Sequence, residues 1–142
     1  MSVTLDQRAL QRLMGVHEDL ARVVHKAAAM SDMDFTVLEG LRTLERQKEL
    51  LAKHATTTLK SRHLTGHAVD LGVMIGGGIR WDWPLYIKLA VVVQAAAAAE
   101  NVPIRWGGTW KPLSATPEIT AKVLSKSFPD GPHFELPSAV YP

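Results

Sequence analysis

The chain has 142 residues, the size of one ordinary domain. Hydrophobic residues make up 46% of it and charged residues 21%, a balance that excludes an intrinsically disordered chain. There is no cysteine, which excludes a disulfide framework, a thiolate nucleophile and a cysteine-based metal site. The formal net charge of +2 is too small to indicate nucleic-acid binding, so we expect no nucleic-acid partner.

The sequence predicts no membrane segment. Residues 1–13 lack the basic region and the uninterrupted apolar region of a secretory signal peptide. The most apolar stretch, residues 85–99, contains Lys88 and Gln94 and is shorter than the ~20 residues that span a bilayer. We therefore expect no signal peptide and no stable membrane association.

The N-terminal part of the chain predicts two helices, a strand and a third helix. Thr4 and Gln7 have the spacing of a capping box, and apolar residues follow at helical spacing, with Gly15 dividing the segment into two helices. Residues 34–38 alternate and include β-branched side chains, as in a strand. An amphipathic helix is then expected over residues 44–54.

The remainder of the chain predicts short strands around one long helix. In chain order we expect a loop at 56–62, a strand at 68–74, a glycine turn at 76–78, a helix at 82–100, a strand at 104–106, a helix from residue 116 and a strand at 132–136. No β-α-β rhythm is present. The pattern predicts an α+β fold with a small, mostly antiparallel sheet and flanking helices.

Imidazoles and carboxylates are concentrated in two short segments of strand-forming sequence, 61–71 and 130–136. Unpaired polar groups are costly in such apolar surroundings, and a zinc ion would resolve that cost. His63, Asp70 and His133 offer two nitrogen ligands and one oxygen ligand, which leaves the fourth position of a catalytic zinc site open. Asp130, three residues before His133, could then act as general base and as proton donor to the leaving amine.

Three other interpretations of these segments stay open. His63 and His67 have the i, i+4 spacing of a helical zinc pair, although the residues between them disfavour a helix. The histidines could instead be structural, with their ring nitrogens satisfied by hydrogen bonds in the core. A serine hydrolase is disfavoured because the chain has no Gly-x-Ser-x-Gly elbow; its candidate nucleophiles would be Ser61, Ser125 or Ser127.

Glu135 and Arg42 each have a functional and a structural interpretation. Glu135 alternates with His133 on the predicted strand, so it could orient that histidine or could be an exposed carboxylate. Arg42 could hold a substrate carboxylate in a bidentate fork. The alternative for Arg42 is an ion pair with Glu39 or Glu45.

Three further residues are candidates for the surroundings of the site. Trp106 and Trp110 flank a Gly-Gly pair and could line a substrate groove, with core packing as the alternative. Ser61, two residues before His63, is expected to support the metal ligands without itself contacting the metal ion.

Four segments together resemble one family of peptidases. Residues 61–70, Ser-Arg-His-Leu-Thr-Gly-His-Ala-Val-Asp, match the S-x-H-x-x-G-x-A-x-D signature of the zinc D-alanyl-D-alanine carboxypeptidase and L-alanyl-D-glutamate endopeptidase family. Residues 130–136 resemble its second motif, which has an acidic residue three positions before the last zinc histidine. Residues 39–43 resemble the segment with the family's substrate-facing arginine, and residues 106–110 resemble a segment of its bacteriophage endolysin branch.

This resemblance implies that residues 1–142 form a single zinc peptidase domain with a fold akin to the hedgehog N-terminal domain and the D-Ala-D-Ala peptidases. It implies Zn²⁺ on His63, Asp70 and His133, with Asp130 as catalytic acid/base and Arg42 near the substrate. The expected substrate is the stem peptide of bacterial peptidoglycan, cut by an L-alanyl-D-glutamate endopeptidase that serves as a phage endolysin. A D-alanyl-D-alanine carboxypeptidase and a non-catalytic, zinc-stabilised cell-wall binding module are the alternatives.

Two positions depart from the family's pattern. The family often has glutamate where this chain has Asp130, although its endolysin-like branch also uses aspartate. Many endolysin relatives have aspartate where this chain has Thr109, so any role of that carboxylate is absent or moved. We expect such an endolysin to be a monomer that stays in the host bacterial cytoplasm until its release to the cell wall.

Overall fold

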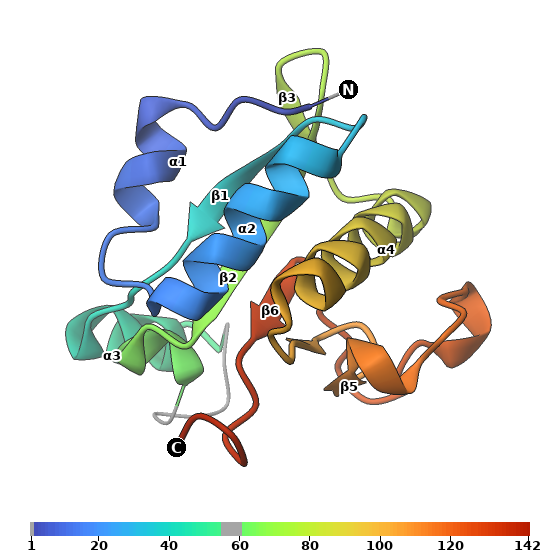
Figure 1. Ribbon diagram of the computed structural model, residues 1–142. Coiled ribbons are helices and arrows are strands. Elements are labelled where there is room, and N and C mark those ends of the chain that lie inside the picture. The colour runs from blue at the N-terminus through green and yellow to red at the C-terminus, as the bar shows by residue number, and fades with distance from the viewer. Residues whose placement is uncertain (1, 55–60) are drawn as a thin grey trace.

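The computed structural model describes residues 2–54 and 61–142. Its helices are α1 (Gln7–Arg12), α2 (Glu18–Met30), α3 (Leu44–Ala52) and α4 (Trp83–Glu100), and its strands are β1 (Phe35–Glu39), β2 (Ala68–Ile75), β3 (Gly78–Arg80), β4 (Arg105–Trp106), β5 (Lys111–Pro112) and β6 (His133–Glu135). The strands form one antiparallel sheet in the order β1-β2-β6-β4-β5, with β3 paired to β2. Helices α2 and α4 lie side by side over one face of this sheet (Figure 1). The predicted α+β class with an antiparallel sheet is confirmed.

Strand β2 separates the hydrophobic core from the opposite face of the sheet. Val69 and Leu71 are buried in one cluster with side chains of α2 and α4. Because successive side chains of a strand point to opposite faces, Asp70 is directed away from that core. The register pairs Asp70 with His133 and Val69 with Phe134. Strand β6 therefore presents Phe134 to the core and His133 to the face that carries Asp70.

Each of the two long helices has one recognisable cap, α2 at its start and α4 at its end. In α2 the Nδ1 atom of His17 accepts a hydrogen bond from the Asp19 amide at 3.1 Å. Helix α4 follows Asp82, has Pro84 in its first turn and ends at Asn101, whose φ of 56° is left-handed. Within the described part of the chain, none of the helices combines the length and the apolarity needed to cross a membrane.

The start of α1 differs from the prediction. Asp6 is the N-cap, and its carboxylate accepts a hydrogen bond from the Ala9 amide at 2.8 Å. The expected capping box between Thr4 and Gln7 is therefore wrong. A carboxylate immediately before the first turn satisfies one of the free amides there and also interacts favourably with the helix dipole.

The helix expected from Thr116 is also wrong. The described residues of this region contain only the 3₁₀ turns η2 (Leu113–Ala115) and η3 (Ala121–Val123). The side-chain amide of Gln94 donates to the carbonyl oxygens of Leu113 and Thr116, at 2.8 and 2.7 Å. These tertiary contacts satisfy the backbone in an irregular path, so the local helix signal does not decide the structure.

The sequence did not predict β3 or β5, which are exposed and too short to show an alternating pattern. The glycine turn is confirmed, because Gly76 and Gly77 form the two-residue connection between β2 and β3, with φ of 61° and 83°. Left-handed conformations at both central positions are typical of such hairpins. Residues 56–60 of the expected loop lie outside the described residues.

Candidate metal centre and active site

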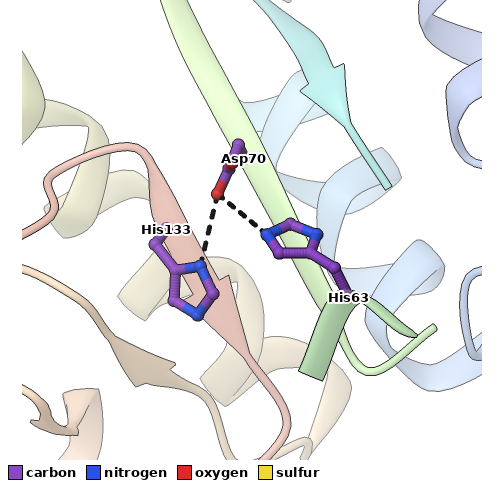
Figure 2. Close-up of side chains that lie close together, drawn as sticks. All are labelled: His63, Asp70 and His133. Atoms are coloured by element: carbon purple, nitrogen blue, oxygen red, sulfur yellow. Dashed lines mark hydrogen bonds and ion pairs between the residues drawn. The ribbon is translucent and has the colours of Figure 1, made fainter. Parts of the chain in front are cut away.

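His63, Asp70 and His133 converge on one point from three different elements (Figure 2). His63 lies in the 3₁₀ turn η1 (Arg62–Thr65), Asp70 lies in β2, and His133 is the first residue of β6. The Oδ1 atom of Asp70 lies 3.2 Å from His63 Nε2 and 3.3 Å from His133 Nδ1. All three candidate ligand atoms lie within 4.8 Å of one another, so together they could hold a metal ion.

The turn that presents His63 is fixed by its neighbours. The Ser61 hydroxyl caps it by accepting a hydrogen bond from the His63 amide at 3.2 Å. Gly66 ends the turn with a φ of 75°, and a side chain there would overlap the carbonyl oxygen of Gly15. The Arg42 amide donates to the His63 carbonyl at 2.8 Å. Ser61 thus supports the backbone of His63 rather than its ring.

In each histidine one ring nitrogen, here called the inner one, faces Asp70, and the other, the outer one, faces a hydrogen-bond acceptor. His63 Nδ1 lies 2.8 Å from the Gly40 carbonyl oxygen, and His133 Nε2 lies 2.8 Å from Glu135 Oε1. These oxygens only accept, so the outer nitrogens carry the protons. In the neutral rings, the inner nitrogens then direct lone pairs at the Asp70 carboxylate. Such facing lone pairs need a cation or an additional proton between them, and histidine metal ligands typically have this outer support.

The charges of the cluster reinforce one another. Burial acts to raise the pKa of Asp70, but hydrogen bonds with His133 and His63 hold it well below its ordinary value. Burial acts to lower the pKa of His133, but Asp70 and Glu135 raise it to about 9. Burial acts to raise the pKa of the Glu135 carboxyl, but the hydrogen bond from His133 lowers it below its ordinary value. A metal ion would replace the extra proton that this cluster favours on His133.

Asp130 lies three residues before the start of β6, in a tightly packed turn. The Asp130 amide donates to the Gly107 carbonyl at 2.9 Å, and the Gly107 amide donates to the His133 carbonyl at 2.8 Å. A side chain at Gly107 would overlap the Asp130 carbonyl oxygen and lie 3.0 Å from the β-carbons of Asp130 and His133. Glycine is therefore needed for this close approach.

The Asp130 carboxyl has the electrostatics of an acid/base group. Burial raises its pKa above the ordinary range, and the charge of Asp70 adds to the effect. The carboxylate forms no hydrogen bond within the described residues. A half-buried carboxyl with a raised pKa and free oxygens, close to a metal-ligand group, suits proton transfer.

Arg42 is held within the protein. Its guanidinium forms a bidentate pair with Glu39, with distances of 2.6 and 2.8 Å, and donates to Gln47 Oε1 at 2.7 Å. The side chain is only 9% exposed. The register of β1 places Glu39 opposite Asp70, so this pair lies beside the metal-ligand group. The structure favours the ion-pair interpretation, and a substrate contact by Arg42 stays a prediction.

The two tryptophans behave differently. Trp106 is fully buried, stacks on Phe134 with ring centroids 6.4 Å apart, and donates from Nε1 to the Gly131 carbonyl at 2.8 Å. No surface of Trp106 remains for a substrate, which corrects its expected groove role to core packing. Trp110 is half-buried, and its ring lies 5.4 Å from that of His133, measured between centroids. Trp110 is thus the tryptophan of the pair that adjoins the site.

Sequence reasoning missed Arg105. The register of β4 and β6 pairs it with Glu135, and its Nη1 atom lies 3.4 Å from Glu135 Oε2. The guanidinium also lies 5.0 Å from the ring centroid of Trp110. The sequence indicates such a contact only through opposite charges on two strands. These charges can be paired only when it is known that the strands are neighbours in the sheet.

Two of the three competing interpretations of the polar segments, the helical zinc pair and the serine hydrolase, find no support among the described residues. His67 is not part of the converging group, and its Nδ1 atom lies 2.6 Å from the Thr65 hydroxyl. The Ser125 hydroxyl bonds the backbone of Ser127. In the part of the chain that the structure describes, no serine hydroxyl bonds a ring nitrogen of His63 or its partner histidine. A helical zinc pair and a serine triad are therefore both unsupported.

Comparison with known proteins gives a consistent result. Residues 1–137 match the family model of the phage L-alanyl-D-glutamate peptidase. The chain is 28% identical over 141 residues to the L-alanyl-D-glutamate peptidase of Escherichia phage T5, covering 96% of this chain and 99% of that protein. It is 28% identical over 102 residues to the L-alanyl-D-glutamate peptidase of Listeria phage A118, covering 66% of this chain and 35% of that protein. The crystal structure of the Serratia marcescens L-Ala D-Glu endopeptidase ChiX is similar with a TM-score of 0.82 and 39% identity, covering 98% of this chain and 94% of that one.

The fold, the convergence of His63, Asp70 and His133 and these similarities define a peptidase. The chain belongs to the phage L-alanyl-D-glutamate peptidase family. The family resemblance drawn from the motifs is confirmed, and so are the expected classes of enzyme and peptidoglycan hydrolase.

Proposed function

We propose that the protein is a zinc-dependent endopeptidase that cuts the L-alanyl-D-glutamate amide in the stem peptide of bacterial peptidoglycan. The observation that carries the zinc assignment is the convergence of His63, Asp70 and His133 with their outer nitrogens already satisfied. The distances of 3.2 and 3.3 Å from Asp70 Oδ1 to the two inner nitrogens match a tetrahedral site. Ligands about 2.0 Å from a tetrahedral zinc ion are separated by about 3.3 Å.

Different residues of the chain carry out different parts of the proposed hydrolysis. When bound, a zinc ion would polarise the scissile carbonyl and lower the pKa of an attacking water toward ~7. Asp130 accepts the proton of that water as its oxygen bonds to the carbonyl carbon, and then delivers the proton to the D-glutamate nitrogen as the C–N bond breaks. Glu135 and the Gly40 carbonyl keep both imidazoles in the tautomer that leaves the inner nitrogens free to bind.

The biological setting is part of the same proposal. The relatives from Escherichia phage T5 and Listeria phage A118 support a phage endolysin that waits in the host cytoplasm until it is released to the cell wall. The proposed ligands and Asp130 all come from one chain, which supports a monomer acting through a single peptidase domain. The names of the family and its relatives favour the endopeptidase over a D-alanyl-D-alanine carboxypeptidase.

Digestion of purified sacculi tests the scissile bond. Cleavage at L-alanyl-D-glutamate exposes a new D-glutamate amino terminus, which amino-terminal labelling and mass spectrometry of the fragments identify. Release of free D-alanine instead would indicate the carboxypeptidase. A chelator is expected to abolish digestion, and added Zn²⁺ is expected to restore it; undiminished digestion in excess chelator would contradict the metal assignment.

The Asp130→Asn variant tests the proton-transfer role. It keeps the three proposed ligands and the shape of the side chain, so we expect one bound zinc ion. Turnover should fall by about 100- to 10,000-fold, the usual contribution of a general acid/base. A metal-replete Asp130→Asn enzyme with full activity would show that another group transfers the proton.

A further inference from the structure

A pocket lined by aromatic side chains opens beside Asp130. Its volume is about 270 Å³. One wall is formed by Trp81, Trp83 and Tyr86, and the other by residues 129–132, which include Asp130. The walls meet because β3 and the segment before β6 both attach to β2. Trp81 directly follows β3, and the Leu71 amide of β2 donates to the Pro132 carbonyl at 2.9 Å.

The pocket has a rigid aromatic platform with an exposed outer face. Trp81 is 62% exposed, and its ring is stacked on Tyr86 with planes 7° apart and centroids 6.2 Å apart. The Tyr86 hydroxyl donates to the Arg80 carbonyl at 2.6 Å and accepts from the Val73 amide at 3.2 Å, which fixes the ring beneath Trp81. An exposed aromatic face on a rigid support, next to reactive groups, is typical of a ligand site.

We infer that this pocket binds the N-acetylmuramyl sugar that carries the stem peptide, an inference that rests on the proposed function. In peptidoglycan the L-alanine nitrogen is joined to the lactyl group of that sugar, so only one amino acid separates the lactyl group from the scissile amide. One residue spans about 3.5 Å and the lactyl group a similar length, so the sugar lies within about 10 Å of the reacting carbonyl. A pocket with Asp130 in its wall meets this requirement.

The chemistry of the pocket favours the sugar over the other side of the substrate. A pyranose ring presents a face of C–H bonds, and its acetamido group adds a methyl, both of which pack well on aromatic rings. The peptide beyond the scissile bond carries carboxylates. Among the described residues that line the pocket, Asp130 is the only charged one, so no cation is present to receive those carboxylates. The neutral, sugar-bearing side of the substrate is the better match.

Kinetics on two peptides test this inference. For an N-acetylmuramyl stem peptide, Trp81→Ala is expected to raise KM about tenfold with little change in kcat, a typical loss for a tryptophan contact. For the same peptide without the sugar, kcat/KM should not change. Trp81→Phe, which keeps an aromatic face, should restore most of the affinity. Phe128→Ala is the matched control, because Phe128 is 86% exposed and lies near Asp130 in sequence but outside the pocket.

A binding measurement separates this inference from catalysis. N-acetylmuramyl-L-alanine, the product on the sugar side, is titrated by calorimetry into unaltered protein, Trp81→Ala and Phe128→Ala. We expect about tenfold weaker binding to Trp81→Ala alone, with circular dichroism showing that each variant is folded. Equal affinity of all three proteins, or an equal effect of Trp81→Ala on both peptides, would overturn the sugar site and leave the peptidase assignment intact. If the unaltered enzyme cleaves neither peptide, the proposed function fails, and the titration still decides the sugar site.

Discussion

Replacing Glu135 by alanine removes the hydrogen bond that fixes the His133 ring without touching the candidate ligand atoms. The bond joins Glu135 Oε1 and His133 Nε2 at 2.8 Å, and the Glu135 side chain is only 8% exposed. A hydrogen bond to a charged group contributes about 1.5–3 kcal/mol to stability, and it is stronger where it is shielded from water. Loss of a group that orients a histidine ligand lowers metal affinity about 10- to 100-fold, which is about 1.4–2.7 kcal/mol. We expect Glu135→Ala to bind zinc more weakly by this factor.

Glu135→Gln provides the matched control, because it keeps the size of the side chain and an oxygen that can accept from His133. It removes only the charge, which also faces Arg105, so its zinc affinity should lie between those of the unaltered protein and Glu135→Ala. Competition with a chromophoric chelator at constant pH measures all three affinities. If Glu135→Ala binds zinc as tightly as the unaltered protein, the His133 ring is oriented by something else, and the argument from its tautomer is refuted.

Two further predictions concern the same centre. In protein treated with a chelator, the pKa of His133 is raised to about 9, above the value of about 6.5 in an unfolded chain. The resulting stability is complete below pH ~6.5 and is lost as pH rises through about 9, so the Tm from calorimetry should fall across this range; a constant or rising Tm would contradict the assignment. Gly107→Ala should lower both turnover and zinc occupancy, because the new methyl group would overlap the Asp130 carbonyl and press on the β-carbons of Asp130 and His133. Gly78→Ala, whose methyl group would meet nothing closer than 4.0 Å, should retain both; equal effects of the two substitutions would contradict the packing argument.

The residues of the centre could be predicted from the sequence because their chemistry is local. Histidine and aspartate stand out within apolar, strand-forming segments, and Gly66 marks the turn between His63 and Asp70. Their meeting point could not be derived in the same way, since it depends on the register that pairs Asp70 with His133. The expectation that these three side chains meet is supported by the resemblance to a peptidase family, whose motifs imply one zinc site.

Two wrong predictions, a groove role for Trp106 and a helix from Thr116, both arise from tertiary contacts that the local sequence does not show. Trp106 was expected in a groove, but β4 lies between β6 and β5, and its pairing with Phe134 places the ring inside the core. The segment after Thr116 has a helix signal, which the tertiary hydrogen bonds of Gln94 override. In both cases the local sequence is ambiguous, and a contact distant in sequence selects the outcome.

The alternation of β2 and β6 couples the stability of the fold to the geometry of the centre. Val69 and Phe134 face the core, whereas Asp70, His133 and Glu135 face the opposite side. A slip of either strand by one residue would exchange these faces. The core would then have to receive carboxylates and imidazoles in place of apolar side chains, at a cost of several kcal/mol for each buried charge. Hydrophobic burial therefore fixes the register that brings Asp70 and His133 together, and the candidate metal centre needs no separate interaction to align the two strands.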